Sequence, residues 1–275
     1  MGSQGMNEEF VFPAGSLIGM VHVGPTPGGA RVGPDIRAMA QAAAAEAKVL
    51  VDAGFDCVLI ENMHDAPYVN GPHLPTTTAA MTAVAIAVRE AIGSMPLGVQ
   101  ILSRGEREAL AVALAVGGAG VGPVFIRCEN FVHAHVADEG LMAEASAGPL
   151  LRYRRAISAE HVAICADIQK KHASHALTSD LTLSDEAHAA EFFGADALIV
   201  TGKFTGSATS LADLEAVREA TKLPIIVGSG ATPDQVPMLL KLAHAIIVGS
   251  WIKKDGNWKN AVDSERAKRF VGEKK

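Results

Sequence analysis

Eight short apolar runs, each followed by polar or glycine-rich residues and then by a helix-forming segment, alternate along this 275-residue chain. A strand that runs parallel to its predecessor needs a crossover, which is usually a helix, so this alternation predicts a parallel sheet. The runs are almost continuously apolar, which is typical of a parallel sheet buried on both faces. The predicted strands cover residues 17–23, 57–61, 97–102, 124–128, 162–168, 197–200, 224–227 and 245–248.

Helix signals fill the intervals between these runs. Helices are expected over residues 35–53, 76–92, 106–116, 148–158, 184–193, 211–221 and 258–271, and over the segment opened by Thr232 and Pro233. Eight strand–helix pairs in a chain of this length predict an α/β fold, a (β/α)₈ TIM barrel. It would be a single domain over residues 1–275, with residues 1–14 as an N-terminal extension. A doubly wound open sheet is the competing fold, but no GxGxxG follows the first run.

Composition excludes several classes of function. The formal net charge of −6 argues against a nucleic-acid partner, and no apolar run is long enough to cross a membrane. Cys57, Cys128 and Cys165 each lie in an apolar stretch, which favours reduced, buried thiols over a disulfide or a zinc site. The first residues carry no secretion signal, so a cytoplasmic location is expected. Because barrels often pair through their outer helices, we also expect a homo-oligomer.

Two glycine-rich turns follow the last two predicted strands. The seventh run ends in Gly228, Ser229 and Gly230, and the eighth ends in Gly249 and Ser250. Parallel strands place both turns at the same end of the sheet. Glycines let the backbone approach a ligand, and consecutive N–H groups can hold an anion. Loops after the last two strands of a barrel often bind phosphate, so these residues predict a phosphate site. The alternative is that the glycines only form tight turns.

Ionisable side chains gather at or just after the ends of the other predicted strands. Proton abstraction next to a carbonyl needs a base, and a cation or donor for the developing oxyanion. The catalytic candidates are Glu61, Asp167, Lys171 and His172; the substrate-binding candidates are His22, Asn62, Asp65, Arg127 and Lys203. Glu61 or Asp167 would act as the base. A structural ring of ion pairs is the alternative, and Schiff-base chemistry at Lys203 is a further one.

No cofactor is required by this reading, but a divalent metal remains open. His22, Glu61 and Asp167, with Asp65 and His172, offer mixed nitrogen and oxygen ligands suited to Zn²⁺, Mn²⁺ or Mg²⁺. No HExxH motif is present, and the HxH of residues 133–135 lies in a long segment rather than at a strand end. That segment, residues 131–150, breaks the strand–helix rhythm and is expected to be a lid or a binding loop.

Several motifs together resemble the BtpA/SgcQ family, grouped with barrels of the ribulose-phosphate-binding type. The matching pieces are GMVHVGPTPG, ENMHDAPY, ADIQKKHA, TGKFTG, VGSGATPDQV and VGSWIKKDG, spread over about residues 17–270. The resemblance implies a (β/α)₈ barrel. A cyanobacterial member is associated with photosystem I accumulation, other members sit among sugar-metabolism genes, and no established reaction comes with the family. After the third strand the family tends to read NVLRND, whereas this chain has QILSRG at residues 100–105.

The first functional hypothesis is an enzyme acting on a small phosphorylated sugar or related metabolite. It would be an isomerase, an epimerase or an aldolase-type lyase, with the phosphate held after strands seven and eight. The alternative is a non-catalytic assembly or stability factor of the photosystem I biogenesis type, which would tolerate Asp167→Asn. A metal-dependent hydrolase is a weaker alternative.

Overall fold

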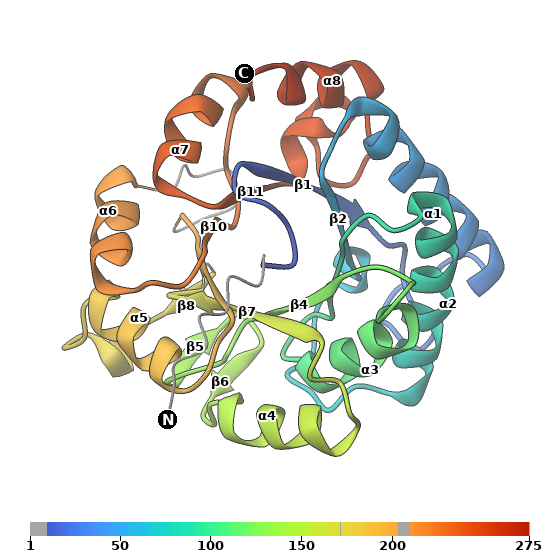
Figure 1. The fold of residues 1–275 in the computed structure, drawn as a ribbon. Helices are drawn as coiled ribbons and strands as arrows, with labels where there is room; N and C mark the ends of the chain where they lie inside the picture. The colour runs from blue at the N-terminus through green and yellow to red at the C-terminus, as the bar shows by residue number, and fades with distance from the viewer. Residues whose placement is uncertain (1–9, 171, 203–209, 275) are drawn as a thin grey trace.

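Eight parallel strands close a barrel, and eight α-helices surround it (Figure 1). A computed structural model describes residues 10–170, 172–202 and 210–274. The barrel strands are β1 (Ser16–His22), β2 (Cys57–Glu61), β3 (Leu97–Gln100), β4 (Val124–Cys128), β7 (Val162–Ile168), β9 (Ala197–Val200), β10 (Ile225–Val227) and β11 (Ala245–Val248). They pair in chain order, and β1 closes the ring by pairing with both β2 and β11. The predicted (β/α)₈ barrel is confirmed.

Alternate residues of each strand point into the barrel, because side chains of a strand alternate between its two faces. The interior is filled by a compact apolar cluster that includes Met20, Leu59, Phe125 and Ile199. Phe125 needs a glycine beside it: a Cβ on Gly98 of β3 would lie 2.3 Å from the Phe125 ring. The barrel is therefore a packed core rather than a pore.

Part of the predicted N-terminal extension belongs to this core. Phe12 is 1 % exposed and packs edge-on against Phe125, with ring centroids 5.5 Å apart. Its carbonyl oxygen also lies 3.0 Å from Nε2 of His244. Residues just before β1 thus cover the amino-terminal end of the barrel, which leaves the carboxyl end for a ligand.

The helices bury their apolar faces against the outside of the strands. They are α1 (Ile36–Ala53), α2 (Pro75–Ile92), α3 (Glu106–Val116), α4 (Ala147–Ala156), α5 (Leu183–Phe192), α6 (Leu211–Ala220), α7 (Val236–Leu242) and α8 (Ser264–Gly272). The signals for α1 act as expected: the Asp35 side chain accepts from the Ala38 N–H, and Gly54 ends the helix with φ 92°. No helix in the described residues combines the length and apolar composition needed to cross a membrane.

Two helix starts differ from the prediction. Pro233–Gln235 forms a 3₁₀ turn rather than the first turn of α7, because Pro237 has no N–H to donate to the carbonyl of residue 233. α8 begins at Ser264, not at residue 258, and the Asp263 side chain caps it. The residues before it, 257–263, form a connection that pairs Val262 with Lys253 and carries Trp258 to the barrel mouth.

The long segment after β4 contains a small hairpin. β5 (His135–Ala137) and β6 (Gly140–Met142) pair antiparallel, and β8 (Ala173–Ser174), from the loop after β7, adds a third strand. This sheet lies beside the carboxyl end of the barrel, and its turn residues Asp138 and Glu139 line the cavity there. All three cysteines are free and buried, as predicted.

Candidate active site

Strand alternation brings one residue from each of the eight strands to a common layer at the carboxyl end. On each strand, the next side chain that points inward lies two residues beyond the last one in the apolar interior. This layer consists of His22, Glu61, Gln100, Arg127, Asp167, Thr201, Gly228 and Gly249. Six of the predicted site residues thus converge because of the period of the strands, not because they are close in sequence: His22, Glu61, Arg127, Asp167, Gly228 and Gly249.

A cavity of about 460 Å³ opens above this layer. The predicted residues that line it are His22, Glu61, Arg127, His172, Gly228, Ser229, Gly230, Gly249 and Ser250. Asn62, Asp65 and Asp167 are buried but are not part of its wall. The remaining two candidates, Lys171 and Lys203, fall outside the described residues.

Asn62 and Asp65 hold the rim of the cavity together. The Asn62 side chain accepts from the Leu102 N–H at 2.6 Å and donates to the Leu102 carbonyl, which ends β3 two residues before the predicted boundary. Asp65 accepts from the amide and the hydroxyl of Thr26 at 2.6 and 2.7 Å, and from Asn62 at 2.8 Å. The pair therefore joins the loops after β1, β2 and β3, and we assign it a positioning role instead of substrate contact.

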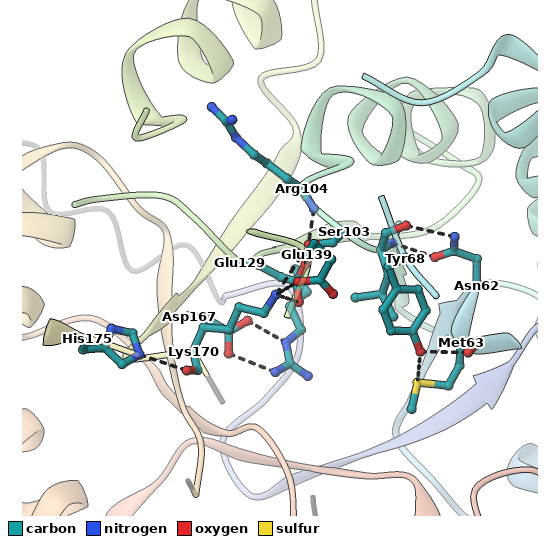
Figure 2. Close-up of polar contacts among 12 residues, drawn as sticks. Asn62, Met63, Tyr68, Ser103, Arg104, Glu129, Glu139, Asp167, Lys170 and His175 are labelled. Carbon is teal, nitrogen blue, oxygen red and sulfur yellow. Dashed lines mark hydrogen bonds and ion pairs between the residues drawn. The ribbon is translucent and has the colours of Figure 1, made fainter. Parts of the chain in front are cut away.

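Arg127 and Asp167 form a buried two-pronged ion pair. Arg127 donates from Nε and Nη2 to the two oxygens of Asp167 at 2.8 and 2.9 Å (Figure 2). Burial by itself would lower the pKa of Arg127, but the Asp167 carboxylate outweighs it and raises that pKa. Arg127 Nη1 also lies 3.4 Å from the Gly228 carbonyl oxygen. Gly228 has no room for a side chain, because a Cβ on this residue would clash with Thr201 and Ile199. Asp167 is thus held by Arg127 and does not line the cavity, whereas Glu61 does.

A second charged group was not predicted from the sequence. Lys170 Nζ lies 3.3 Å from Glu129 and 3.6 Å from Glu139, at the tip of the β5–β6 hairpin (Figure 2). Burial alone would lower the pKa of Lys170, but these two carboxylates outweigh burial and raise that pKa. Burial alone would raise the pKa of Glu129, but the cations Lys170 and Arg127 bring that pKa below its ordinary value. Lys170 is therefore a permanent cation facing the cavity, not a neutral amine.

The sequence indicated the positions of Glu129, Lys170 and Glu139 with different strength. Glu129 directly follows a predicted strand, so its position alone indicated the barrel mouth. Lys170 stands beside two predicted site residues, Lys171 and His172, and the strand end did not indicate that Lys170 lines the cavity. Glu139 lies in the segment expected to be a lid or binding loop, but nothing in that segment indicated its contact with Lys170.

Glu61 and His22 lie together on adjacent strands. Their side chains approach to 3.9 Å, and His22 Nδ1 lies 2.8 Å from the Trp258 carbonyl oxygen. Tyr68 lines the same wall and donates its hydroxyl to the Met63 carbonyl at 2.8 Å. Burial, with a further contribution from Glu61, raises the pKa of Tyr68, so it stays a neutral phenol. Glu61 thus lines the cavity together with the imidazole of His22 and the neutral phenol of Tyr68.

The two glycine turns form the part of the cavity wall that follows β10 and β11. No acceptor within residues 10–170, 172–202 and 210–274 receives the N–H of Ser229 or Gly230, and the Ser229 hydroxyl is buried without a partner there. Gly230 has φ 78°, a conformation that favours glycine. Gly249 faces His22, since a Cβ there would lie 3.2 Å from His22 Nε2. These turns present open donors to the cavity, as an anion site requires.

The residues present do not fit a metal. Within the described part of the chain, no three His, Cys, Asp or Glu side chains group as metal ligands would. His22 and Glu61 are adjacent, but Asp167 is engaged by Arg127. His133 and His135 of the HxH motif lie in or beside β5 and join no such group either. No step of the chemistry below is therefore assigned to a metal.

The hairpin carries a histidine that predicts pH-dependent stability. Burial, His175 and Lys170 lower the pKa of His135 to about 4. An unfolded histidine has a pKa of about 6.5. The contribution of neutral His135 to the free energy of unfolding is therefore fully present above that pH and is lost as the pH falls toward 4. Between pH 7 and pH 5, urea unfolding should show a stability loss about 2 kcal/mol smaller in His135→Gln than in the unsubstituted protein.

The control for this measurement is His188→Gln, because His188 is exposed on α5. It should retain the full pH dependence. Carboxylates that titrate between pH 7 and pH 5 contribute equally to the stability loss of the variant and of the unsubstituted protein, so they cancel in the difference. Equal pH dependence in the His135→Gln and unsubstituted proteins would show that His135 is not held in its neutral form.

Comparison with known proteins identifies relatives over nearly the whole chain. The family model described as "BtpA family" matches residues 14–275. The mitochondrial protein F13E9.13 of Caenorhabditis elegans is 41 % identical over 93 % of this chain and 91 % of its own length. The Photosystem I biogenesis protein BtpA of Synechocystis is 36 % identical over 93 % of this chain and 86 % of its own length.

Solved structures share the fold at low sequence identity. The crystal structure of 3-hexulose-6-phosphate synthase aligns over 94 % of this chain and 99 % of that chain, with a TM-score of 0.56. The identity is 13 %, so the likeness concerns the barrel alone.

Proposed function

This chain belongs to the BtpA family, and from that premise we propose that it is an enzyme acting on a small phosphorylated sugar or related metabolite. The supporting observation is that open glycine turns and a charged cluster face each other across one cavity. The reaction class is isomerisation, epimerisation or aldol-type cleavage. All three begin by removing a proton next to a carbonyl or from a hydroxyl, and all develop negative charge on oxygen.

In this proposal the turns hold the phosphate. The N–H groups of Ser229, Gly230 and Ser250, together with the Ser229 hydroxyl, would donate to its oxygens. Gly228 and Gly249 let the turns pack closely on the barrel wall, since a Cβ there would meet Thr201 or His22. Barrel enzymes commonly bind phosphate at this place, which adds support from the fold.

Glu61 would remove the proton, and Lys170 would stabilise the charge that develops. Glu61 is 6 % exposed and lies at the carboxyl end of β2, 3.9 Å from His22 in the cavity wall. Lys170 stays protonated, so it supplies a fixed positive charge in a partly desolvated site, where such charges act most strongly. Arg127 and His22 would contact the substrate, Asp167 would fix Arg127, and His172 lines the cavity. Lys171 and Lys203 keep the roles proposed from the sequence.

An assembly factor of the photosystem I type is the second candidate. The observation in its favour is that the Synechocystis relative, at 36 % identity, is a Photosystem I biogenesis protein by name. Such a factor would keep its function in Asp167→Asn, whereas the enzyme needs Arg127 held in place. We also infer a homo-oligomer, because Phe192 is 86 % exposed at the end of α5, and sedimentation velocity tests this. A cytoplasmic location remains our proposal for this chain.

Replacing Ser250 with aspartate should weaken binding of inorganic phosphate at least about tenfold, since a carboxylate would lie in the anion site. Isothermal titration with phosphate measures the change. Ser94→Asp, at an exposed position between α2 and β3, adds the same charge elsewhere and should bind phosphate like the unsubstituted protein. Equal affinities for all three proteins, or no binding to any of them, would contradict a phosphate site at these turns.

A further inference from the structure

The two ends of the cavity have opposite hydrogen-bonding character. The glycine turns offer N–H donors, as described above. The end formed by the loop after β4 and by the β5–β6 hairpin offers acceptors: the carboxylates of Glu129 and Glu139 both line it, and each side chain is 8–9 % exposed. A ligand that spans the cavity therefore meets donors at one end and carboxylates at the other.

The cations on this wall are matched by carboxylates of the protein. Among the described lining residues there are four carboxylates, Glu61, Glu129, Asp138 and Glu139, and two permanent cations, Arg127 and Lys170. Arg127 is bound by both oxygens of Asp167, and Lys170 lies between Glu129 and Glu139. To pair directly with either cation, a full carboxylate of a ligand would have to compete with these protein carboxylates.

From this polarity we propose that the substrate is a monophosphate of a polyhydroxylated chain whose other end is uncharged, and not a phosphorylated carboxylic acid. The inference rests on the proposed function, because it takes the phosphate to lie at the glycine turns. Substrate hydroxyls can donate to Glu129 and Glu139 in charge-assisted hydrogen bonds. A substrate carboxylate at the same place would face buried like charges, whose repulsion water screens poorly.

Two commercial probes separate these ligand classes. D-glucitol 6-phosphate and 6-phospho-D-gluconate share a six-carbon open chain and a phosphate, and differ in a terminal CH₂OH or carboxylate. Isothermal titration of the full chain should give at least about tenfold tighter binding of glucitol 6-phosphate, a difference of 1.4 kcal/mol. Inorganic phosphate is titrated in parallel to establish that the phosphate site is present.

Removing one carboxylate should narrow the difference. In Glu139→Gln, and separately in Glu129→Gln, the ratio of the two affinities should fall to about threefold or less, because one repelling carboxylate is gone and Lys170 keeps only one protein carboxylate as a partner. Glu90→Gln, at an exposed position of α2, removes a charge far from the mouth and should keep the original ratio.

The outcomes distinguish this inference from the function on which it rests. Binding of inorganic phosphate together with equal or tighter binding of 6-phosphogluconate overturns the inference and leaves the phosphate site standing. Failure of inorganic phosphate and both esters to bind overturns the proposed function, and the inference with it. Tighter binding of glucitol 6-phosphate whose advantage shrinks in the glutamine variants supports both.

Discussion

Replacing Arg127 with methionine should lower the free energy of unfolding by about 3–5 kcal/mol. The substitution leaves the Asp167 carboxylate, whose side chain is fully buried, without the guanidinium that binds both of its oxygens. An uncompensated charge in a desolvated position is among the largest single-residue costs in a folded protein. Urea unfolding at pH 7, followed by circular dichroism, measures the loss.

An exposed ion pair on the same protein provides the matched control. Lys48 and Asp52 of α1 approach to 3.3 Å, but their side chains are 67 % and 60 % exposed. Lys48→Met should therefore change stability by less than about 1 kcal/mol. If Arg127→Met and Lys48→Met cost the same, the Arg127–Asp167 pair is solvated in solution and cannot fix the floor of the site.

Replacing Glu61 with glutamine should slow proton exchange on the substrate by about 10²–10⁴-fold. Glutamine keeps the size of the side chain but cannot accept a proton. Nuclear magnetic resonance in D₂O gives the rate, as loss of carbon-bound hydrogen from aldose and ketose monophosphates of three to six carbons. The affinity for inorganic phosphate should stay within a fewfold of the unsubstituted protein, because the donors proposed for the phosphate belong to the glycine turns and not to Glu61.

Glu90→Gln again serves as the control and should exchange hydrogen at the original rate. A Glu61→Gln protein that exchanges as fast as the control would remove Glu61 from the role of base. If the unsubstituted protein exchanged no hydrogen on any sugar phosphate of the panel, the proposed reaction class would be wrong.

The fold was predictable because its signal repeats. Continuous apolar runs such as residues 57–61 and 245–248 predicted buried parallel strands, and eight of them with intervening helices leave few alternatives to a barrel. Strand alternation then dictated that His22, Glu61 and Arg127 share one layer. Element ends were less predictable, since tertiary contacts set them: the Asn62 side chain captures the backbone of Leu102 and so ends β3 early.

The pairing of the site residues was not predictable from their spacing. Asp167 and Arg127 are 40 positions apart, and only their places on the adjacent strands β7 and β4 reveal that they neutralise each other. Lys170 and Glu139 meet because a hairpin folds over the loop after β7, and no local pattern encodes that contact. Sequence reasoning thus locates the wall of such a site better than it assigns the partners within it.

A crystal structure of the protein with D-glucitol 6-phosphate tests the central claim most directly. The phosphate should lie within about 2.7–3.2 Å of the backbone nitrogens of Ser229 and Ser250, with the carbon chain directed toward Glu61 and Lys170. Phosphate bound anywhere else at saturating ligand, with the turns at residues 228–230 and 249–250 empty, would contradict it.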